Sequence, residues 1–166
     1  MERVPNKGWI YYMDNIDLVI LKILQDNGRE TASSISKRIH LSVSAVLDRI
    51  HKLEENGVVK KYTVLLDSRK LGYDVLAVME VRLEHPRYYD SFVEAVQSNS
   101  NIVDCYYLTG DFDFNLKISC RSSEELEDLH RFVKEIPGVS GTITHYVLKE
   151  VKNIYEVSPA GAEDAI

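Results

Sequence analysis

Apolar residues recur with a helical period in the first part of the chain. Between residues 14 and 27 they return every three or four positions, and an Asn-Gly pair then gives a typical helix end. Thr31 and Ser42 are residue types that cap the start of a helix, and only residues 40–41 separate the two helices that they predict. The pattern therefore predicts three helices, of which the second and third form a helix-turn-helix.

The third helix predicts both a buried stripe and a following strand. The stripe comprises Val43, Val46, Ile50 and Leu53. Gly57 then suits the left-handed conformation that ends a helix. Residues 58–66 are β-branched and aromatic around Lys60 and Lys61, which favours a strand or short hairpin, the usual position of a wing.

The period changes from helical to alternating after a loop at residues 67–72. The predicted elements are a strand at 75–84, a helix at 88–98, strands at 102–108 and 112–120 around a turn at 109–111, a helix capped by Ser122 or Ser123, and a strand at 139–151. This β-α-β-β-α-β order matches the ferredoxin-like motif. The fold class is α+β, a winged helix-turn-helix followed by a ferredoxin-like domain.

Helices should cover one face of the antiparallel sheet and leave the other face open. The open face is predicted to carry Leu76, Val78, Tyr107 and Tyr146. Because these side chains are apolar or aromatic, we expect the face to be buried against another subunit.

Composition and charge narrow the class of partner. The chain has 166 residues, 45% of them hydrophobic, which is enough for two small domains, and a net charge of −6. That charge divides unevenly, into +2 for residues 1–66 and −8 for the rest. Phosphate neutralisation drives DNA binding, so we expect DNA to bind the first part only.

The sequence shows no sign of a membrane span, a secretory signal, a metal site or a catalytic motif. The longest apolar runs contain charged residues and no secretory signal is recognisable, so a cytoplasmic protein without membrane spans is expected. Cys105 and Cys120 are predicted to be free thiols, buried or half-buried. The histidines lack metal-ligand spacing, and neither a phosphate loop nor a nucleophile motif is present. We expect no enzyme, no metal and no cofactor.

The candidate DNA-binding residues lie on the predicted second and third helices and in the wing. They are Ser42, Ser44, Ala45, Asp48, Arg49, Lys52, Lys37, Arg38, Lys60 and Lys61. Arg49 could donate to guanine or phosphate, and Lys52 to phosphate. Asp48 could accept from a cytosine amine or pair with a basic neighbour. A solvated helix face is the alternative interpretation.

A second candidate site is the loop at residues 109–113. Thr109, Asp111 and Asp113 surround Gly110, an arrangement that could bind a cation or the ammonium group of an amino acid. A simple hairpin turn would have the same composition.

The motifs together resemble the Lrp/AsnC family of feast/famine regulators. They read Asp-x-x-Asp, Asn-Gly-Arg, Leu-Ser, Arg-Ile-x-x-Leu-Glu-x-x-Gly-Val-Val and Lys-Lys-Tyr, then Leu71-Gly72, Thr109-Gly110-x-x-Asp113 and Ile136-Pro137-Gly138-Val139. The resemblance covers residues 13–152. It implies a transcription regulator that binds double-stranded DNA and forms homodimers through its sheets, with further assembly to octamers or discs.

The resemblance also implies an effector, typically an amino acid held between neighbouring dimers. The candidate residues are Thr109, Gly110, Asp111 and Asp113, with Tyr107, Thr142 and Tyr146 as weaker candidates. Binding should shift assembly state or DNA affinity. The expected domains are an extension at 1–12, a DNA-binding domain at 13–66, a linker at 67–74, an effector and oligomerisation domain at 75–152, and a tail at 153–166.

Two other functions are compatible with parts of this pattern. The second domain could be an amino-acid-sensing module associated with a metabolic enzyme, with the N-terminal helices serving assembly only. An RNA-binding domain shares the ferredoxin-like topology. However, the strand at 112–120 places Asp113 and Asn115 where RNA-binding domains need aromatic and basic residues.

Overall fold

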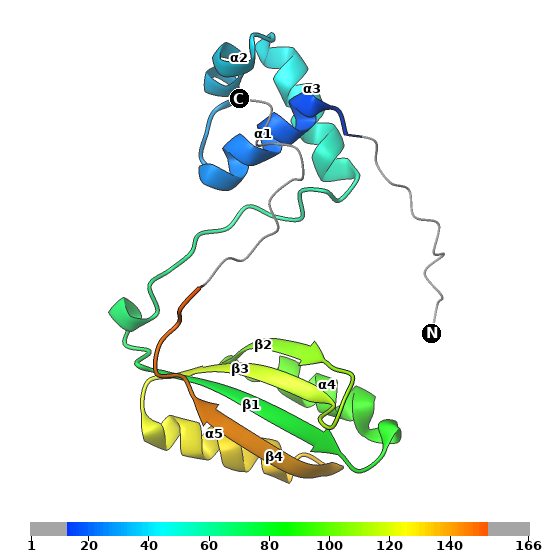
Figure 1. Ribbon diagram of the computed structural model, residues 1–166, viewed down its shortest axis with the longest axis vertical. Coiled ribbons are helices and arrows are strands. Elements are labelled where there is room, and N and C mark those ends of the chain that lie inside the picture. The colour runs from blue at the N-terminus through cyan, green and yellow to red at the C-terminus, as the bar shows by residue number, and fades with distance from the viewer. Residues whose placement is uncertain (1–12, 153–166) are drawn as a thin grey trace. The chain divides into compact units, whose positions relative to one another are not determined.

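The computed structural model describes residues 13–152, which divide into two compact units with a boundary between Leu65 and Leu66 (Figure 1). The first unit is helical, and the second contains the sheet. The predicted extension at residues 1–12 and the predicted tail at residues 153–166 lie outside the described residues.

Three helices form the first unit: α1 (Asn15–Asp26), α2 (Ala32–Ile39) and α3 (Val43–Glu55). The predicted caps are confirmed, because the hydroxyl groups of Thr31 and Ser42 each accept a backbone hydrogen bond at 3.2 Å. The helices pack around a small apolar cluster. Its buried residues are Ile20, Ile23, Ile35, Val46 and Leu53.

The turn between α2 and α3 depends on one left-handed residue. His40 has a φ of 55°, and the next amide, that of Leu41, bonds back to the Ser36 carbonyl at 3.1 Å. A left-handed conformation costs a residue with a Cβ about 1–2 kcal/mol. It ends α2 abruptly, so that Ser42 can cap α3 directly afterwards. The predicted helix-turn-helix is therefore confirmed.

The strand or hairpin predicted for residues 58–66 is wrong. The amides of Val58 and Val59 bond to the Leu53 carbonyl, and from Lys60 onward the segment is exposed and forms no strand. High β propensity does not suffice, because a strand needs a neighbour for its N–H and C=O groups. The one sheet found in the described residues has no strand beside this segment.

The second unit follows the predicted β-α-β-β-α-β order. Its main elements are β1 (Val75–Leu83), α4 (Tyr89–Gln97), β2 (Ile102–Tyr107), β3 (Phe114–Cys120), α5 (Ser123–Glu135) and β4 (Val139–Tyr146). Short 3-10 helices occupy Arg69–Leu71 and Pro86–Tyr88. The strands are antiparallel in the order β2-β3-β1-β4, which confirms the ferredoxin-like topology (Figure 1).

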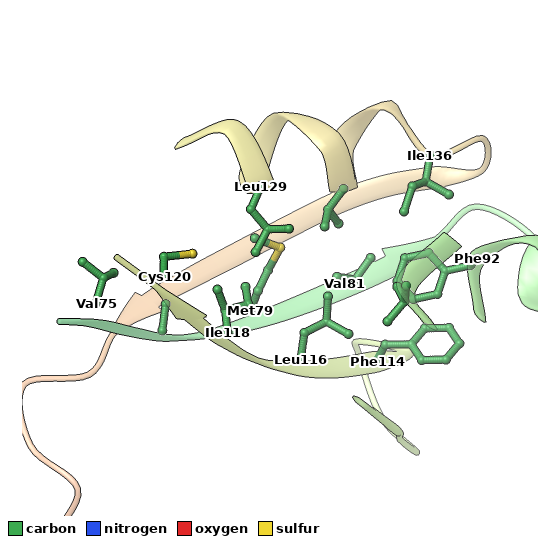
Figure 2. Packing of buried hydrophobic residues seen from close by; sticks show 13 residues of the cluster. Val75, Met79, Val81, Phe92, Phe114, Leu116, Ile118, Cys120, Leu129 and Ile136 are labelled. Carbon is green, nitrogen blue, oxygen red and sulfur yellow. The ribbon is translucent and has the colours of Figure 1, made fainter. Parts of the chain in front are cut away.

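The core of this unit lies between the sheet and its two helices. Alternate residues of β1 and β3 are buried, and Figure 2 shows Leu129 of α5 and Phe92 of α4 directed at that same face of the sheet. Each large apolar side chain contributes about 1.5–3 kcal/mol when fully buried. The strict alternation therefore decides which face receives the helices.

Two of the four side chains predicted for the open face lie on the helix-covered face instead. Tyr107 is opposite the buried Phe114, and Tyr146 is opposite Ala77. The reason is a register shift in each edge strand. The shift lies between Ile102 and Asp104 in β2, and opposite Arg82–Leu83 in β4. Beyond each shift, the side chains that would have pointed to one face of the sheet point to the other. Leu76 and Val78 do lie on the open face.

The last strand ends five residues earlier than predicted, at Tyr146 rather than residue 151. Its partner β1 begins at Val75, so the ladder closes with the hydrogen bond from the Val147 amide to the Leu76 carbonyl at 2.9 Å. The chain beyond that bond has no strand to pair with. Within residues 13–152, no helix is long and apolar enough to cross a membrane.

Gly138 is predicted to be the glycine of the second unit that tolerates a side chain least. Its φ is 88°, and a Cβ placed there would lie 2.1 Å from Cγ of Tyr88. Replacing Gly138 with Ala should lower the free energy of unfolding by about 2–4 kcal/mol, because a left-handed alanine and an overpacked ring contact both cost energy. Urea denaturation measures this change.

Gly72→Ala is the matched control for this prediction. Gly72 has a similar φ of 82°, but a Cβ at this position would have no other atom within 4 Å. Its replacement should cost only the conformational part, about 1–2 kcal/mol. Equal losses for the two variants would show that the Tyr88 contact does not constrain Gly138.

Candidate DNA-binding surface and effector loop

A column of polar side chains runs along the exposed side of α3. Ser44, Asp48 and Lys52 are spaced four residues apart, so they lie one above another on the helix, and all three are exposed. Of the other candidates on this helix, Ser42 uses its hydroxyl group as the N-cap, and Ala45 is half-buried. The column presents a hydroxyl group, a carboxylate and an ammonium group to solvent.

Arg49 faces α1 instead of that column. Its Nη1 lies 2.7 Å from Oδ1 of Asp17 and 2.8 Å from Oδ2 of Asp14, and its side chain is only 28% exposed. Asp17 is buried, and it also takes part in the capping box at the start of α1. The sequence prediction of a base or phosphate contact missed this ion-pair cluster, which is built from the Asp-x-x-Asp motif.

The cluster also affects the charge state of its exposed carboxylate. The hydrogen bond from the Asp17 amide, and then the guanidinium of Arg49, lower the pKa of Asp14 below its ordinary value. A lowered carboxyl pKa stabilises the fold above the ordinary pKa, and this contribution is lost as the pH falls through the lowered value. The junction of α1 with α3 should therefore weaken in acid.

Further basic residues flank α3. Lys37 and Arg38 are exposed in the last turn of α2. The chain just beyond α3 exposes Lys60 and Lys61. Hydrogen bonds to α3 flank them on both sides: the Val59 amide donates to the Leu53 carbonyl, and the Tyr62 hydroxyl group donates to Glu54 at 2.9 Å. Burial and this carboxylate raise the pKa of Tyr62 to about 12. The two lysines are thus held near the end of α3 without a wing strand.

Sequence reasoning missed two exposed apolar residues on α3. The predicted buried stripe includes Val43, but this residue is 42% exposed, and Leu47, one turn further on, is 45% exposed. Val43 follows the cap directly, so the stripe extends past the end of the core at this position. Their three- or four-residue spacing is indistinguishable from that of core residues in the sequence alone.

The loop between β2 and β3 is tied to β1 through Asp113. The Asp113 amide donates to the Val81 carbonyl at 2.9 Å, and its Oδ2 accepts from the Leu83 amide at 2.7 Å. Arg82 donates from Nε to the Asp111 carbonyl at 2.7 Å and stacks on the Phe112 ring. The Asp113 carboxylate therefore supports the loop, whereas that of Asp111 is exposed.

The other effector candidates are distributed over the sheet. Thr109, Gly110 and Asp111 are exposed together at the tip of the loop, and Tyr107 lies just before them, 5.0 Å from the ring of Tyr89. Thr142 and Tyr146 lie on β4, beyond β1 from this loop. Tyr146 is four residues further along than Thr142, about 13 Å at strand spacing, so the structure does not bring it to the loop.

Thr142 instead lies beside α5. Its hydroxyl group is 3.4 Å from Nε2 of His130. No group of three or more His, Cys, Asp or Glu residues in the described part of the chain could hold a metal ion. Both cysteines are free, as predicted, but Cys105 is exposed rather than buried, because β2 is an edge strand.

Both units match known protein families. Residues 13–60 match the family of winged helix-turn-helix DNA-binding domains, and residues 76–157 match the Lrp/AsnC ligand binding domain. The two matches coincide with the helical unit and the sheet-containing unit, respectively.

Relatives of similar length match most of this chain. The HTH-type transcriptional regulator FL11 of Pyrococcus horikoshii is 39% identical over 145 residues, covering 87% of this chain and 95% of that protein. The leucine-responsive regulatory protein of Haemophilus influenzae is 34% identical over 155 residues, 92% of this chain and 91% of the relative.

Solved structures agree over most of the chain. The structure of Escherichia coli AsnC has a TM-score of 0.83 at 26% identity. The match covers 90% of this chain and 100% of the AsnC chain. A transcriptional regulator of Neisseria meningitidis, solved as a complex with L-Met, has a TM-score of 0.83 at 28% identity. The match covers 88% of this chain and 96% of the Neisseria chain.

Fold, site and relatives define a transcriptional regulator that joins a DNA-binding helix-turn-helix to a ligand-binding domain. The chain belongs to the Lrp/AsnC family.

The Arg49 cluster is predicted to stabilise the helical unit. Replacing Arg49 with Gln leaves the buried Asp17 carboxylate without its cation. The free energy of unfolding at neutral pH should fall by about 3 kcal/mol, as expected when one member of a buried pair is removed. Thermal or urea denaturation followed by helical circular dichroism measures the change.

Lys22→Gln serves as the control, since Lys22 forms an exposed pair with Asp26 within α1. Its loss should change stability by no more than about 0.5 kcal/mol. If both variants unfold like the wild type, the cluster has no structural importance and Arg49 is available for DNA.

Proposed function

We propose that the chain is a sequence-specific regulator that binds double-stranded DNA through α3 and responds to an amino acid through its second unit. The observation that carries the DNA-binding part is the exposed column of Ser44, Asp48 and Lys52, on a helix that ion pairs attach firmly to α1. We further infer that the effector acts by changing the assembly of the protein.

The dimensions and charges of α3 support insertion into the major groove. A helix of 13 residues is about 20 Å long and fits a groove about 12 Å wide. Ser44 and Asp48 would meet base edges, where a carboxylate can accept from the amino group of cytosine. The phosphate contacts would come from the flanking cations, Lys52, Lys37, Arg38, Lys60 and Lys61.

Arg49 has a different part in this proposal. Its guanidinium is shared by two carboxylates at 2.7 and 2.8 Å, so a move to DNA would leave the buried Asp17 unpaired. The cost of an uncompensated buried charge favours the observed arrangement. Arg49 would therefore orient the recognition helix as a positioning residue, and Ser42 and Ala45 would contribute at its start.

The effector proposal places an amino acid at the tip of the β2–β3 loop. Backbone amides around Gly110 can donate to a carboxylate, and the exposed Asp111 can accept from an ammonium group. Thr109 and Tyr107 border the same tip, while Asp113 holds the loop in shape. The L-Met complex of the Neisseria meningitidis relative supports an amino acid as the ligand class.

Assembly would use the open face of the sheet. Leu76, Val78 and Ile143 are apolar on that face, and Glu80 and Lys117 give it both signs of charge. Under a two-fold axis a mixed-charge apolar surface can complement its own copy. We propose a homodimer through this face, with further assembly to larger oligomers such as octamers, and effector binding between dimers.

Salt dependence separates the two roles assigned to basic residues on α3. Lys52→Ala should weaken DNA binding and lower the slope of log K against log salt by about 1, because one phosphate contact is lost. Arg49→Gln should weaken binding without changing the slope. Fluorescence anisotropy with a specific duplex measures both.

A lower slope in the Arg49 variant would assign a phosphate contact to Arg49 and contradict the positioning role. An unchanged affinity and slope in both variants would remove α3 from the DNA interface altogether.

Asp111 is predicted to couple the effector to assembly. The wild-type chain should sediment as a dimer or larger species, and the distribution should shift when an amino acid is added. Asp111→Asn should keep the ligand-free distribution but lose at least tenfold in effector affinity, because a charge-assisted hydrogen bond is removed. Asp90→Asn on α4, another exposed aspartate, is the control. A normal response of Asp111→Asn would move the site away from the loop.

A further inference from the structure

Two apolar side chains on the recognition helix are only partly covered by the described residues of the helical unit. Val43 and Leu47 are 42% and 45% exposed, although other apolar residues of α3, such as Val46 and Leu53, are fully buried. Neither belongs to the apolar cluster of the helical unit. Adjacent exposed apolar residues on a surface proposed to bind a partner are candidates for contact with that partner.

The position of the pair indicates which partner. Val43 and Leu47 are four residues apart, so they form a second column beside the polar column of Ser44, Asp48 and Lys52. The two columns lie on the exposed part of α3. Lys52 gives the polar column a positive charge, and Lys37 is exposed on the preceding helix α2. A polyanion whose surface carries apolar groups between its charges fits this face.

The major groove of DNA offers one apolar group at base edges, the C5-methyl of thymine. A leucine beside the polar column on the groove-facing surface can bury that methyl group and exclude water from it. Cytosine offers no such group, and its amino group would instead suit the adjacent Asp48.

We propose that Leu47, supported by Val43, reads the C5-methyl group of thymine, so that α3 selects thymine at the base steps it covers. This inference rests on the proposed function, since it requires α3 to enter the major groove. It makes Leu47 a specificity-determining residue and assigns a base preference to a helix whose polar column alone does not define one.

The test removes single methyl groups from the DNA. Specific duplexes are first selected from a random pool with the full-length chain. Each thymine of the selected site is then replaced by deoxyuridine, which lacks only the C5-methyl group and keeps the same hydrogen-bonding groups. At one or more positions in each half-site, the wild type should bind the uracil duplex about fourfold more weakly per methyl group.

Leu47→Ala should bind thymine and uracil duplexes equally at those positions. Alanine is the best helix former, and Leu47 is 45% exposed and lies outside the apolar cluster, so the variant should fold. Leu65→Ala is the control, because Leu65 is exposed at 66% but lies outside α3, and it should keep the fourfold preference.

The outcomes are distinct. Specific binding that is insensitive to uracil at every position, or a thymine preference that Leu47→Ala retains, would overturn the inference and leave the proposed function standing. Failure to select any sequence would overturn the inference together with the proposed function.

Discussion

The ion-pair cluster of Arg49 with Asp14 and Asp17 attaches α3 to the start of α1. Asp17 is buried and would be costly without a cation, so the start of α1 and the middle of α3 are joined at a fixed point. The apolar cluster that the three helices share is small, and each of the helices is short. The ion pairs of Arg49 therefore contribute strongly to the orientation of α3 about its axis.

The second unit follows a different constraint, the alternation of the central strand β1. Its inward residues are buried at every second position, and they fix the face on which α4 and α5 pack. Asp113 then attaches the β2–β3 loop to the end of β1 by two hydrogen bonds. A loop supported in this way can present Thr109 to Asp111 with little conformational freedom, which lowers the entropy cost of binding a small ligand.

Much of this architecture could be predicted from sequence, because it depends on local chemistry. The caps Thr31 and Ser42, the turn at His40 and the β-α-β-β-α-β order all follow from short-range patterns. Prediction fails where the outcome depends on distant partners. Residues 58–66 have strand propensity but no neighbouring strand, and bulges in β2 and β4 reverse the faces of Tyr107 and Tyr146. The sequence pattern also does not indicate the ion pair of Arg49 with Asp17, because the two residues lie 32 positions apart along the chain. Exposed Leu47 cannot be told from a core residue by spacing.

We propose that an amino acid bound by the second unit controls DNA binding by the first. This control is tested most directly by titrating the full-length chain against the DNA upstream of its own gene and against other genomic fragments, at fixed salt, with and without each amino acid. We expect saturable binding to particular fragments and a change in affinity with at least one amino acid. Specific binding that no amino acid alters would contradict the coupling between the two units, and absence of specific binding to any fragment would contradict the proposed DNA-binding function.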